Sequence, residues 1–178
     1  MNEIDPQRTN RAQQFEIWKN APNPMLVFVR KMDVTNLIKI SRRKRLKFNM
    51  LLDYCIGKAA IDQQEFYLLP MGDKLMRFDK IAINTIVKNH TGEASSCDIE
   101  FTKDFEKYKH DYLRYTKQVA KSCKDRDLSE ASALMKTPLY KSMKYCPGVV
   151  MGLSSSKVTV FLSSLMVTSF LIFTKELQ

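Results

Sequence analysis

The spacing of hydrophobic and polar positions changes several times along this chain, and each change predicts a different element. Apolar residues recur at intervals of three and four between residues 48 and 60, which predicts a buried helix. Residues 105–123 show a longer and more charged helical pattern, and residues 8–20 show a shorter one that ends before two prolines. A further helix is expected after Asp33 or Thr35, because either side chain can cap its first turn.

Short runs rich in β-branched and aromatic residues lie between these helical patterns and predict strands. They are residues 25–29, 65–69, 75–78, 81–87 and 97–101, with a short extended segment beginning at Ser132. The second and third runs flank Met71, Gly72 and Asp73, which predicts a hairpin. The alternation of helices and strands indicates an α/β fold, and no linker divides residues 1–178 into two domains.

The last apolar segment, from Val158 to Phe173, carries no charged residue over 16 positions. A membrane-spanning helix needs about 20 predominantly apolar residues, and this segment also contains several hydroxyl side chains. We therefore interpret it as a buried strand over residues 158–162 followed by a helix. A membrane anchor is the alternative interpretation.

Composition narrows the class of protein further. With 178 residues, of which 44% are hydrophobic and 27% charged, the chain fits a single globular domain with a sizeable core. The first residues are polar and acidic, so no secretory signal peptide is predicted. Four widely spaced cysteines, Cys55, Cys97, Cys123 and Cys146, indicate reduced thiols in a cytoplasmic protein rather than disulfides or a zinc site.

The formal net charge is +10, and much of it comes from residues 39–47, where six of nine side chains are Lys or Arg. We interpret this basic run as the solvated end of a helix and its loop, because cations there complement the helix dipole. Binding of nucleic acid or of an anionic membrane surface is the alternative. No aromatic residues interleave with the cations, so neither partner is expected.

The sequence from Arg11 to Asn20, followed by Ala21-Pro22-Asn23-Pro24-Met25, resembles the N-terminal signature of the chloramphenicol acetyltransferase family. Similar blocks occur at residues 33–39, 46–52, 87–98 and 112–123, so the resemblance extends over about residues 8–136. It implies the coenzyme-A-dependent acyltransferase fold, an α/β (α+β) architecture in which a two-layer mixed sheet is flanked by helices.

The resemblance also implies a chemistry. Members of this family transfer the acetyl group of acetyl-CoA to a hydroxyl of a small molecule such as chloramphenicol, which gives antibiotic resistance, and they form trimers with sites at the subunit interfaces. We therefore expect acetyl-CoA as cosubstrate, a small-molecule hydroxyl acceptor and a homotrimer. On this interpretation the basic run of residues 39–47 would attract the phosphates of the cofactor.

Four candidate site residues follow from the resemblance. Ser132 corresponds to the hydroxyl donor that stabilises the tetrahedral oxyanion, with an ordinary strand serine as the alternative. Trp18 takes the place of an aromatic that lines the acceptor pocket, and Met25 belongs to the same substrate-binding block. Arg11 corresponds to a structural arginine whose family partner, an aspartate, is missing here, so it is expected to be exposed or to pair elsewhere, for example with Glu176.

The sequence departs from the family at the catalytic base. The family has two adjacent histidines and, after three residues, Asp-Gly, whereas the matching segment beyond residue 157 contains no histidine and no aspartate. Depending on register, the histidine positions fall at residues 161–162 or 163–164. The part after about residue 137 is expected to be shortened and divergent, as compensating frameshifts in the gene would produce.

The remaining candidate bases and nucleophiles are few. His90 is expected in a turn, His110 on the exposed side of a charged helix, and Cys146 as a structural thiol. The sequence therefore predicts either an acetyltransferase of this family or a pseudoenzyme that keeps only the ligand-binding scaffold. A basic protein that binds nucleic acid or a membrane surface is the third hypothesis.

Overall fold

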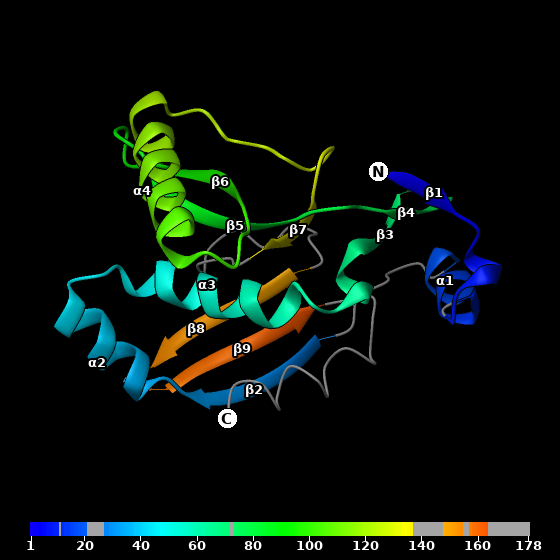
Figure 1. Cartoon of the computed structure of the whole chain (residues 1–178), viewed down its shortest axis with the longest axis horizontal. Coiled ribbons are helices and arrows are strands. Elements are labelled where there is room, and N and C mark those ends of the chain that lie inside the picture. Colours follow the sequence, from blue (N-terminus) through cyan, green and yellow to red (C-terminus); the bar gives the residue numbers. More distant parts are fainter. Residues whose placement is uncertain (11, 21–26, 72, 137–147, 155–156, 164–178) are drawn as a thin grey trace.

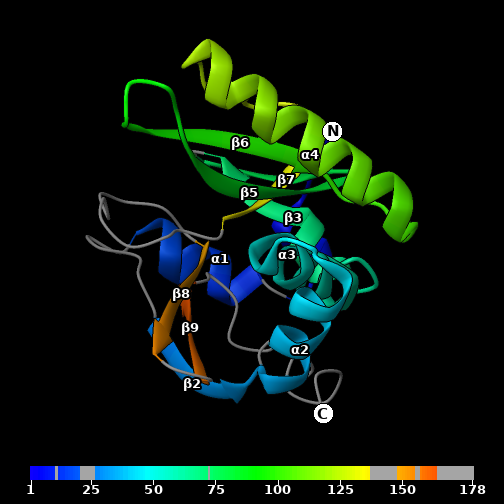
Figure 2. The same cartoon turned by 90° about the vertical axis from the view of Figure 1, so that its left-hand side faces the viewer.

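Three small sheets hold the strands in the part of the chain that the structure describes (Figures 1 and 2). The computed structural model describes all residues except 11, 21–26, 72, 137–147, 155–156 and 164–178. The first sheet joins β1 (Asn2–Ile4), β4 (Lys74–Arg77) and β3 (Leu68–Met71) in that order. The second joins β2 (Val27–Asp33), β9 (Lys157–Ser163) and β8 (Gly148–Ser154), and the third joins β6 (Ala94–Glu100), β5 (Ile81–Lys88) and β7 (Ala133–Lys136).

The third sheet is mixed, because β5 pairs antiparallel with β6 and parallel with β7. The described pairings of the other two sheets are all antiparallel. The predicted combination of a mixed sheet with flanking helices is therefore confirmed. The strands are nevertheless divided among three sheets, and the second sheet joins the N-terminal β2 to the C-terminal β9.

The helices are α1 (Ala12–Lys19), α2 (Thr35–Lys44), α3 (Phe48–Ala60) and α4 (Phe105–Ser122), with 3-10 helices at Pro6–Arg8 and Gln64–Tyr67. The most deeply buried of them is α3, whose Met50, Ile56 and Ala60 share one core with Ile83 and Ile99 of the third sheet. The core helix predicted over residues 48–60 is confirmed at both ends, because its apolar spacing is a local property of the sequence.

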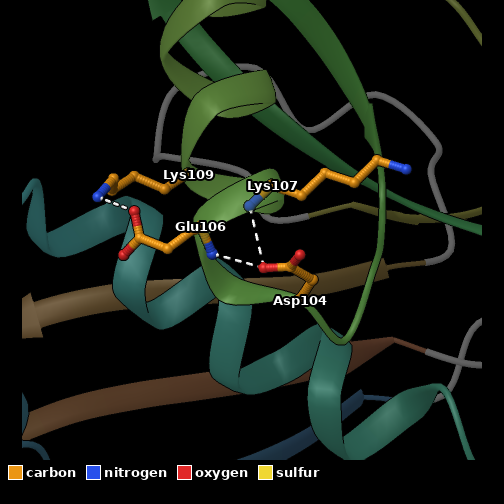
Figure 3. Close-up of polar contacts among 4 residues, drawn as sticks. All are labelled: Asp104, Glu106, Lys107 and Lys109. Carbon is orange, nitrogen blue, oxygen red and sulfur yellow. Dashed lines mark hydrogen bonds and ion pairs between the residues drawn. The ribbon is translucent and has the colours of Figure 1, made fainter.

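Helix α4 lies along one face of the β5–β6 pair (Figure 2). It begins where the Asp104 carboxylate accepts hydrogen bonds from the N–H groups of Glu106 and Lys107, at 3.0 and 3.2 Å. Figure 3 shows these two bonds beside the ion pair of Glu106 with Lys109. The helix predicted over residues 105–123 is confirmed, because both its cap and its apolar stripe are readable in the sequence.

Helix α2 ends in the basic run. Arg42, Arg43 and Lys44 form its last turn, and Arg45 follows with a left-handed φ of 51°. The Leu46 N–H donates to the Ser41 carbonyl at 2.9 Å, which closes this turn. All six cations of residues 39–47 are exposed, so the predicted solvated helix end and loop is confirmed.

Some element boundaries differ from the prediction. The strand predicted from Glu65 begins only at Leu68, because Gln64–Tyr67 form a 3-10 turn in which the Tyr67 hydroxyl donates to the Ile61 carbonyl at the end of α3. Strand β2 continues to Asp33, beyond the predicted end at Val29, since it pairs along its whole length with β9. Strand β8 has no counterpart in the prediction, because the Pro-Gly pair at its start indicates a break in regular structure.

The C-terminal strand predicted over residues 158–162 is confirmed as β9. The helix predicted after it lies outside the described residues. Within the described part of the chain, no helix is long and apolar enough to cross a membrane.

Candidate functional site

The third sheet presents two different faces at the β5–β6 pair. Because side chains alternate along a strand, Ile83 and Ile99 point to the face covered by α3 and α4, where both are fully buried. Asn84 and Asp98 are directly opposite each other across the two strands and point to the other face. They are only 5% and 2% exposed. A buried amide beside a buried carboxylate requires hydrogen-bond partners.

The Asp98 carboxylate receives hydrogen bonds on both of its oxygens. Its Oδ1 accepts from the Asn84 side-chain amide, and its Oδ2 accepts from the backbone N–H of Leu128 at 2.8 Å. The Asn84 amide also donates to the Ser96 hydroxyl at 2.5 Å. Two N–H donors satisfy this buried carboxyl group and offset part of the cost of burying it.

Leu128 belongs to the crossing segment, residues 124–131, which carries the chain from α4 to β7 (Figure 1). Its first part runs along the free edge of β6: the Arg126 N–H donates to the Ser96 carbonyl at 3.0 Å, and the Arg126 carbonyl accepts from the Asp98 N–H at 2.9 Å. Its second part turns, because the Leu128 carbonyl accepts from the N–H groups of Ala131 and Ser132, both at 2.9 Å. The segment thus passes from β6 over Asp98 to the start of β7.

The Arg126 side chain fastens the crossing segment to α4 as well. Its guanidinium donates to the Asp98 backbone carbonyl and lies 3.9 Å from the centre of the Tyr115 ring. A guanidinium over an aromatic face contributes about 0.5–2 kcal/mol. The beginning of the segment is therefore held by contacts with two different elements.

Ser132 directly precedes β7 and is only 1% exposed. Its N–H is bonded to Leu128, but its hydroxyl oxygen has no hydrogen-bond partner among the described residues. Ala133 lies opposite Ile81, so Ser132 is placed beside the beginning of β5. Leaving a buried hydroxyl without a partner costs about 1–3 kcal/mol, so this group has an unused capacity to bind a ligand.

The opposite face of the sheet carries a second group of buried polar side chains, under α4. Burial raises the pKa values of the Tyr108 and Tyr112 hydroxyls, and the nearby Asp53 carboxylate raises both further. Burial also raises the pKa of the Cys97 thiol to about 11, although the Arg126 charge acts in the opposite direction. These groups are neutral near pH 7, so none of them is an activated nucleophile.

The predicted site residues are placed unequally. Ser132 lies in the arrangement just described, and Trp18 belongs to α1. Arg11 and Met25 lie outside the described residues, as does Glu176, the suggested partner of Arg11. The suggested roles of Trp18, Met25 and Arg11 therefore stay predictions.

The two histidines of the sequence lie away from Ser132. His90 is exposed in the turn after the far end of β5, where its N–H donates to the Ala120 carbonyl at 3.1 Å, whereas Ser132 is beside the beginning of that strand. His110 is exposed on α4, with its Nδ1 3.4 Å from Asp111 Oδ1. The predicted turn and exposed helix positions are confirmed, and neither imidazole is hydrogen-bonded to the Ser132 hydroxyl.

Comparison with known proteins connects this arrangement to a family. The family model for chloramphenicol acetyltransferases matches residues 1–142, which include the crossing segment and Ser132. This chain belongs to the chloramphenicol acetyltransferase family. The match ends close to residue 137, after which the sequence is expected to diverge from the family. No curated protein sequence matches the chain significantly.

Solved structures agree with this assignment at the level of the fold. A chloramphenicol acetyltransferase is similar with a TM-score of 0.75 and 13% identity, over 99% of this chain and 97% of that one. A probable dihydrolipoamide acetyltransferase from Listeria monocytogenes has a TM-score of 0.63 and 11% identity, over 99% and 93% of the two chains. The dihydrolipoamide acetyltransferase of Azotobacter vinelandii has a TM-score of 0.58 and 13% identity, over 99% and 89%. The predicted acyltransferase fold is confirmed.

Sequence reasoning about the chloramphenicol acetyltransferase family indicated Ser132 but missed Asn84, Asp98 and Arg126. Asp98 lies in a strand whose alternate residues are apolar, a position usually assigned to a solvent-exposed side chain. Its burial depends on Leu128, which is thirty positions away in the sequence. No local signal reports such a contact.

Proposed function

We propose that this chain is a coenzyme-A-dependent acyltransferase of the chloramphenicol acetyltransferase type, in which Ser132 donates a hydrogen bond to the oxyanion and the general base for hydroxyl acceptors has been lost. The buried Ser132 hydroxyl, without a partner among the described residues, carries the proposal. A serine, a histidine and an asparagine have been studied for their role in the catalytic mechanism of the Azotobacter vinelandii relative, which supports a catalytic serine in this fold.

The proposed reaction has two separable requirements. The acceptor atom attacks the carbonyl carbon of the acetyl thioester, the carbonyl oxygen becomes an oxyanion that accepts a hydrogen bond from Ser132, and the intermediate collapses with loss of the CoA thiolate. A hydroxyl acceptor must also lose its proton, and a general base accelerates this by about 10²–10⁴-fold. A thiol with a pKa of about 8.5 ionises in mild alkali without a catalyst. As an acceptor it therefore needs the oxyanion donor but no general base.

This difference gives the test. Acetyl transfer from acetyl-CoA to chloramphenicol and to a small dithiol is measured at pH 9 by chromatography of the acetylated products, against a reaction without protein. We expect no transfer to the hydroxyl above that background, but measurable transfer to the thiolate. Ser132→Ala should lower thiolate turnover by about 10²–10³-fold, whereas Ser129→Ala, at an exposed serine of the crossing segment, should leave it unchanged.

Three results would contradict the proposal. Transfer to chloramphenicol above background would mean that a base is present, with His90 and His110 of a neighbouring subunit as the first candidates. Equal thiolate turnover by the parent and Ser132→Ala would remove Ser132 from the chemistry. A chain that binds coenzyme A in calorimetry yet acetylates neither acceptor would be the non-catalytic scaffold.

We propose further that the functional unit is one domain over residues 1–178, assembled as a homotrimer with its sites between subunits. Multimeric assembly is known for a relative of the same fold, which forms the cubic core of the pyruvate dehydrogenase multienzyme complex. That relative has a TM-score of 0.58 and 14% identity, over 99% of this chain and 89% of its own.

A second candidate function rests on the basic run. Its six cations are exposed, and none of them forms an ion pair with a described acidic residue. Replacing Arg42, Arg43 and Arg45 by Ala should weaken binding of coenzyme A if the run attracts cofactor phosphates. Salt-sensitive binding of duplex DNA or of anionic vesicles, lost in the same triple variant, would instead support a polyanion-binding surface.

A further inference from the structure

We propose that Asp98 is the positioning residue for Ser132: its buried carboxylate, bonded to Asn84 on one side and to the Leu128 N–H on the other, fixes the crossing segment and thereby the place of the Ser132 hydroxyl. This inference rests on the proposed role of Ser132 as oxyanion donor. It assigns Asp98 no contact with substrate, only control over a group that makes one.

The connection from Asp98 to Ser132 takes two steps. Asp98 Oδ2 accepts from the Leu128 N–H at 2.8 Å, and the Leu128 carbonyl accepts from the Ser132 N–H at 2.9 Å. Both bonds end on the same backbone residue. A shift of Leu128 therefore moves Ser132 directly, without any change in β5 or β6.

Burial alone does not hold the crossing segment in place. Most of its side chains are exposed, and only Arg126 and Leu128 are half-buried. The segment has almost no apolar surface with which to anchor itself, so its hydrogen bonds to β6 must determine where it lies. An oxyanion donor works only at about 2.7–3.1 Å from the developing charge, and a misplacement of about 1 Å can lower the rate by about 10²-fold.

Exchanging the two opposed side chains tests this arrangement. In Asp98→Asn, one hydrogen-bond donor replaces an acceptor, so the new amide must face an N–H group with its NH₂, either at Asn84 or at Leu128. In Asn84→Asp, two carboxylates face each other. The double variant Asn84→Asp/Asp98→Asn restores complementary bonding. Its carboxylate at position 84 accepts from the amide NH₂ at position 98, while the oxygen of that amide accepts from the Leu128 N–H.

Two measurements are made on each folded variant. The first is kcat and KM for transfer of the acetyl group to the thiolate acceptor at pH 9. The second is amide hydrogen exchange at Leu128 and Ser132, with Ile83 and Ile99 in the same sheet as internal references. The references separate a local release of the crossing segment from a general loss of stability.

We expect Asp98→Asn to lower kcat about 10–100-fold with little change in KM for acetyl-CoA, and to accelerate exchange at Leu128 and Ser132 about tenfold or more relative to the references. The double variant should recover most of both losses. If Asp98→Asn does not fold, Arg126→Met tests the same point, because it loosens the start of the segment and leaves Asp98, Asn84 and Leu128 in place. It should change both readouts in the same direction.

Unchanged exchange at Leu128 and Ser132 in Asp98→Asn, or in Arg126→Met if that variant is used, would overturn the inference. Accelerated exchange with unchanged kcat would overturn it as well, provided that Ser132→Ala is impaired. If Ser132→Ala is fully active, the proposed function fails instead, and the exchange data alone then decide whether Asp98 holds Ser132.

Discussion

Tyr108 and Tyr112 lie one turn apart on α4, with ring centres 6.2 Å apart, yet their hydroxyls differ in what they contact. Tyr112 is hydrogen-bonded to Thr85 on β5. The Tyr108 hydroxyl is fully buried and has no hydrogen-bond partner among the described residues. At the scale of single residues, the presence or absence of a hydrogen-bond partner therefore decides what each hydroxyl contributes to the free energy of unfolding.

This difference gives a matched pair of substitutions. Tyr108→Phe removes a group that was desolvated without a bond, so we expect stability to be unchanged or to rise by up to about 1 kcal/mol. Tyr112→Phe removes a bond and leaves Thr85 without that partner, so we expect a loss of about 1 kcal/mol. Urea denaturation followed by circular dichroism measures both. A larger loss for Tyr108→Phe would mean that its hydroxyl has a partner after all.

The raised pKa of the Cys97 thiol should make the free energy of unfolding depend on pH in the alkaline range. Its pKa is raised by burial from 9.0 to about 11, so above pH 9 the unfolded chain loses this proton while the folded chain keeps it. The contribution is fully present below pH 9 and is lost as pH rises from about 9 to 11, because a pKa difference of 1 between the two states corresponds to about 1.4 kcal/mol. Cys97→Ala should flatten the decline between pH 9 and 10, as measured by the urea midpoint. An equally steep decline would contradict it.

At the scale of elements, α4 depends on a single side chain to begin. The Asp104 carboxylate satisfies two N–H groups of the first turn (Figure 3). We expect Asp104→Ala to cost about 1 kcal/mol, and Asp104→Asn to cost less, since it keeps one acceptor oxygen. Thermal and urea unfolding provide the comparison. Equal losses in the two variants would show that the charge matters here rather than the hydrogen bonds.

For a substitution at Gly57 on α3, helix propensity and side-chain packing predict opposite changes in stability. Replacing a mid-helix glycine by alanine stabilises an isolated helix by about 1 kcal/mol. A Cβ at position 57 would overlap the ring of Phe101, which follows β6, so we expect Gly57→Ala to destabilise the fold by about 1–3 kcal/mol. The penalty should shrink in a Phe101→Leu background, and additive effects in this double-mutant cycle would argue against a direct clash.

The elements that could be predicted are those whose causes are local. The apolar spacing of helices α3 and α4 lies within their own residues, and so does the residue that caps α4. The second half of β2 pairs with β9, which is distant in the sequence, so its own residues do not define it. Strand β8 was missed for a different reason, because it begins at Gly148, part of a Pro-Gly pair that indicates a turn. The site residues also differ in how far the sequence predicts them. Ser132 could be predicted from the resemblance to the family, whereas predicting the role of Asp98 requires the strand register and its contact with a residue thirty positions away.

At the scale of the whole molecule, subunit assembly decides which side chains lie near Ser132. Neither histidine is hydrogen-bonded to the Ser132 hydroxyl within one chain, so only another subunit of the proposed trimer could bring an imidazole to it. We expect light scattering to give three times the 20.7 kDa chain mass, independent of concentration in the micromolar range. A monomer mass would contradict this assembly and would leave Ser132 without any imidazole.

The pairing of β2 with β9 also sets the order in which the molecule can be completed. Even the nearest pair of this ladder, Asp33 with Lys157, joins the first part of the chain to its last part. During synthesis β2 therefore emerges from the ribosome long before its partner exists, and its backbone groups stay open to pairing with other chains. The ladder can form only once residues 157–163 have emerged, so the unpaired edge of β2 is open to aggregation until that point.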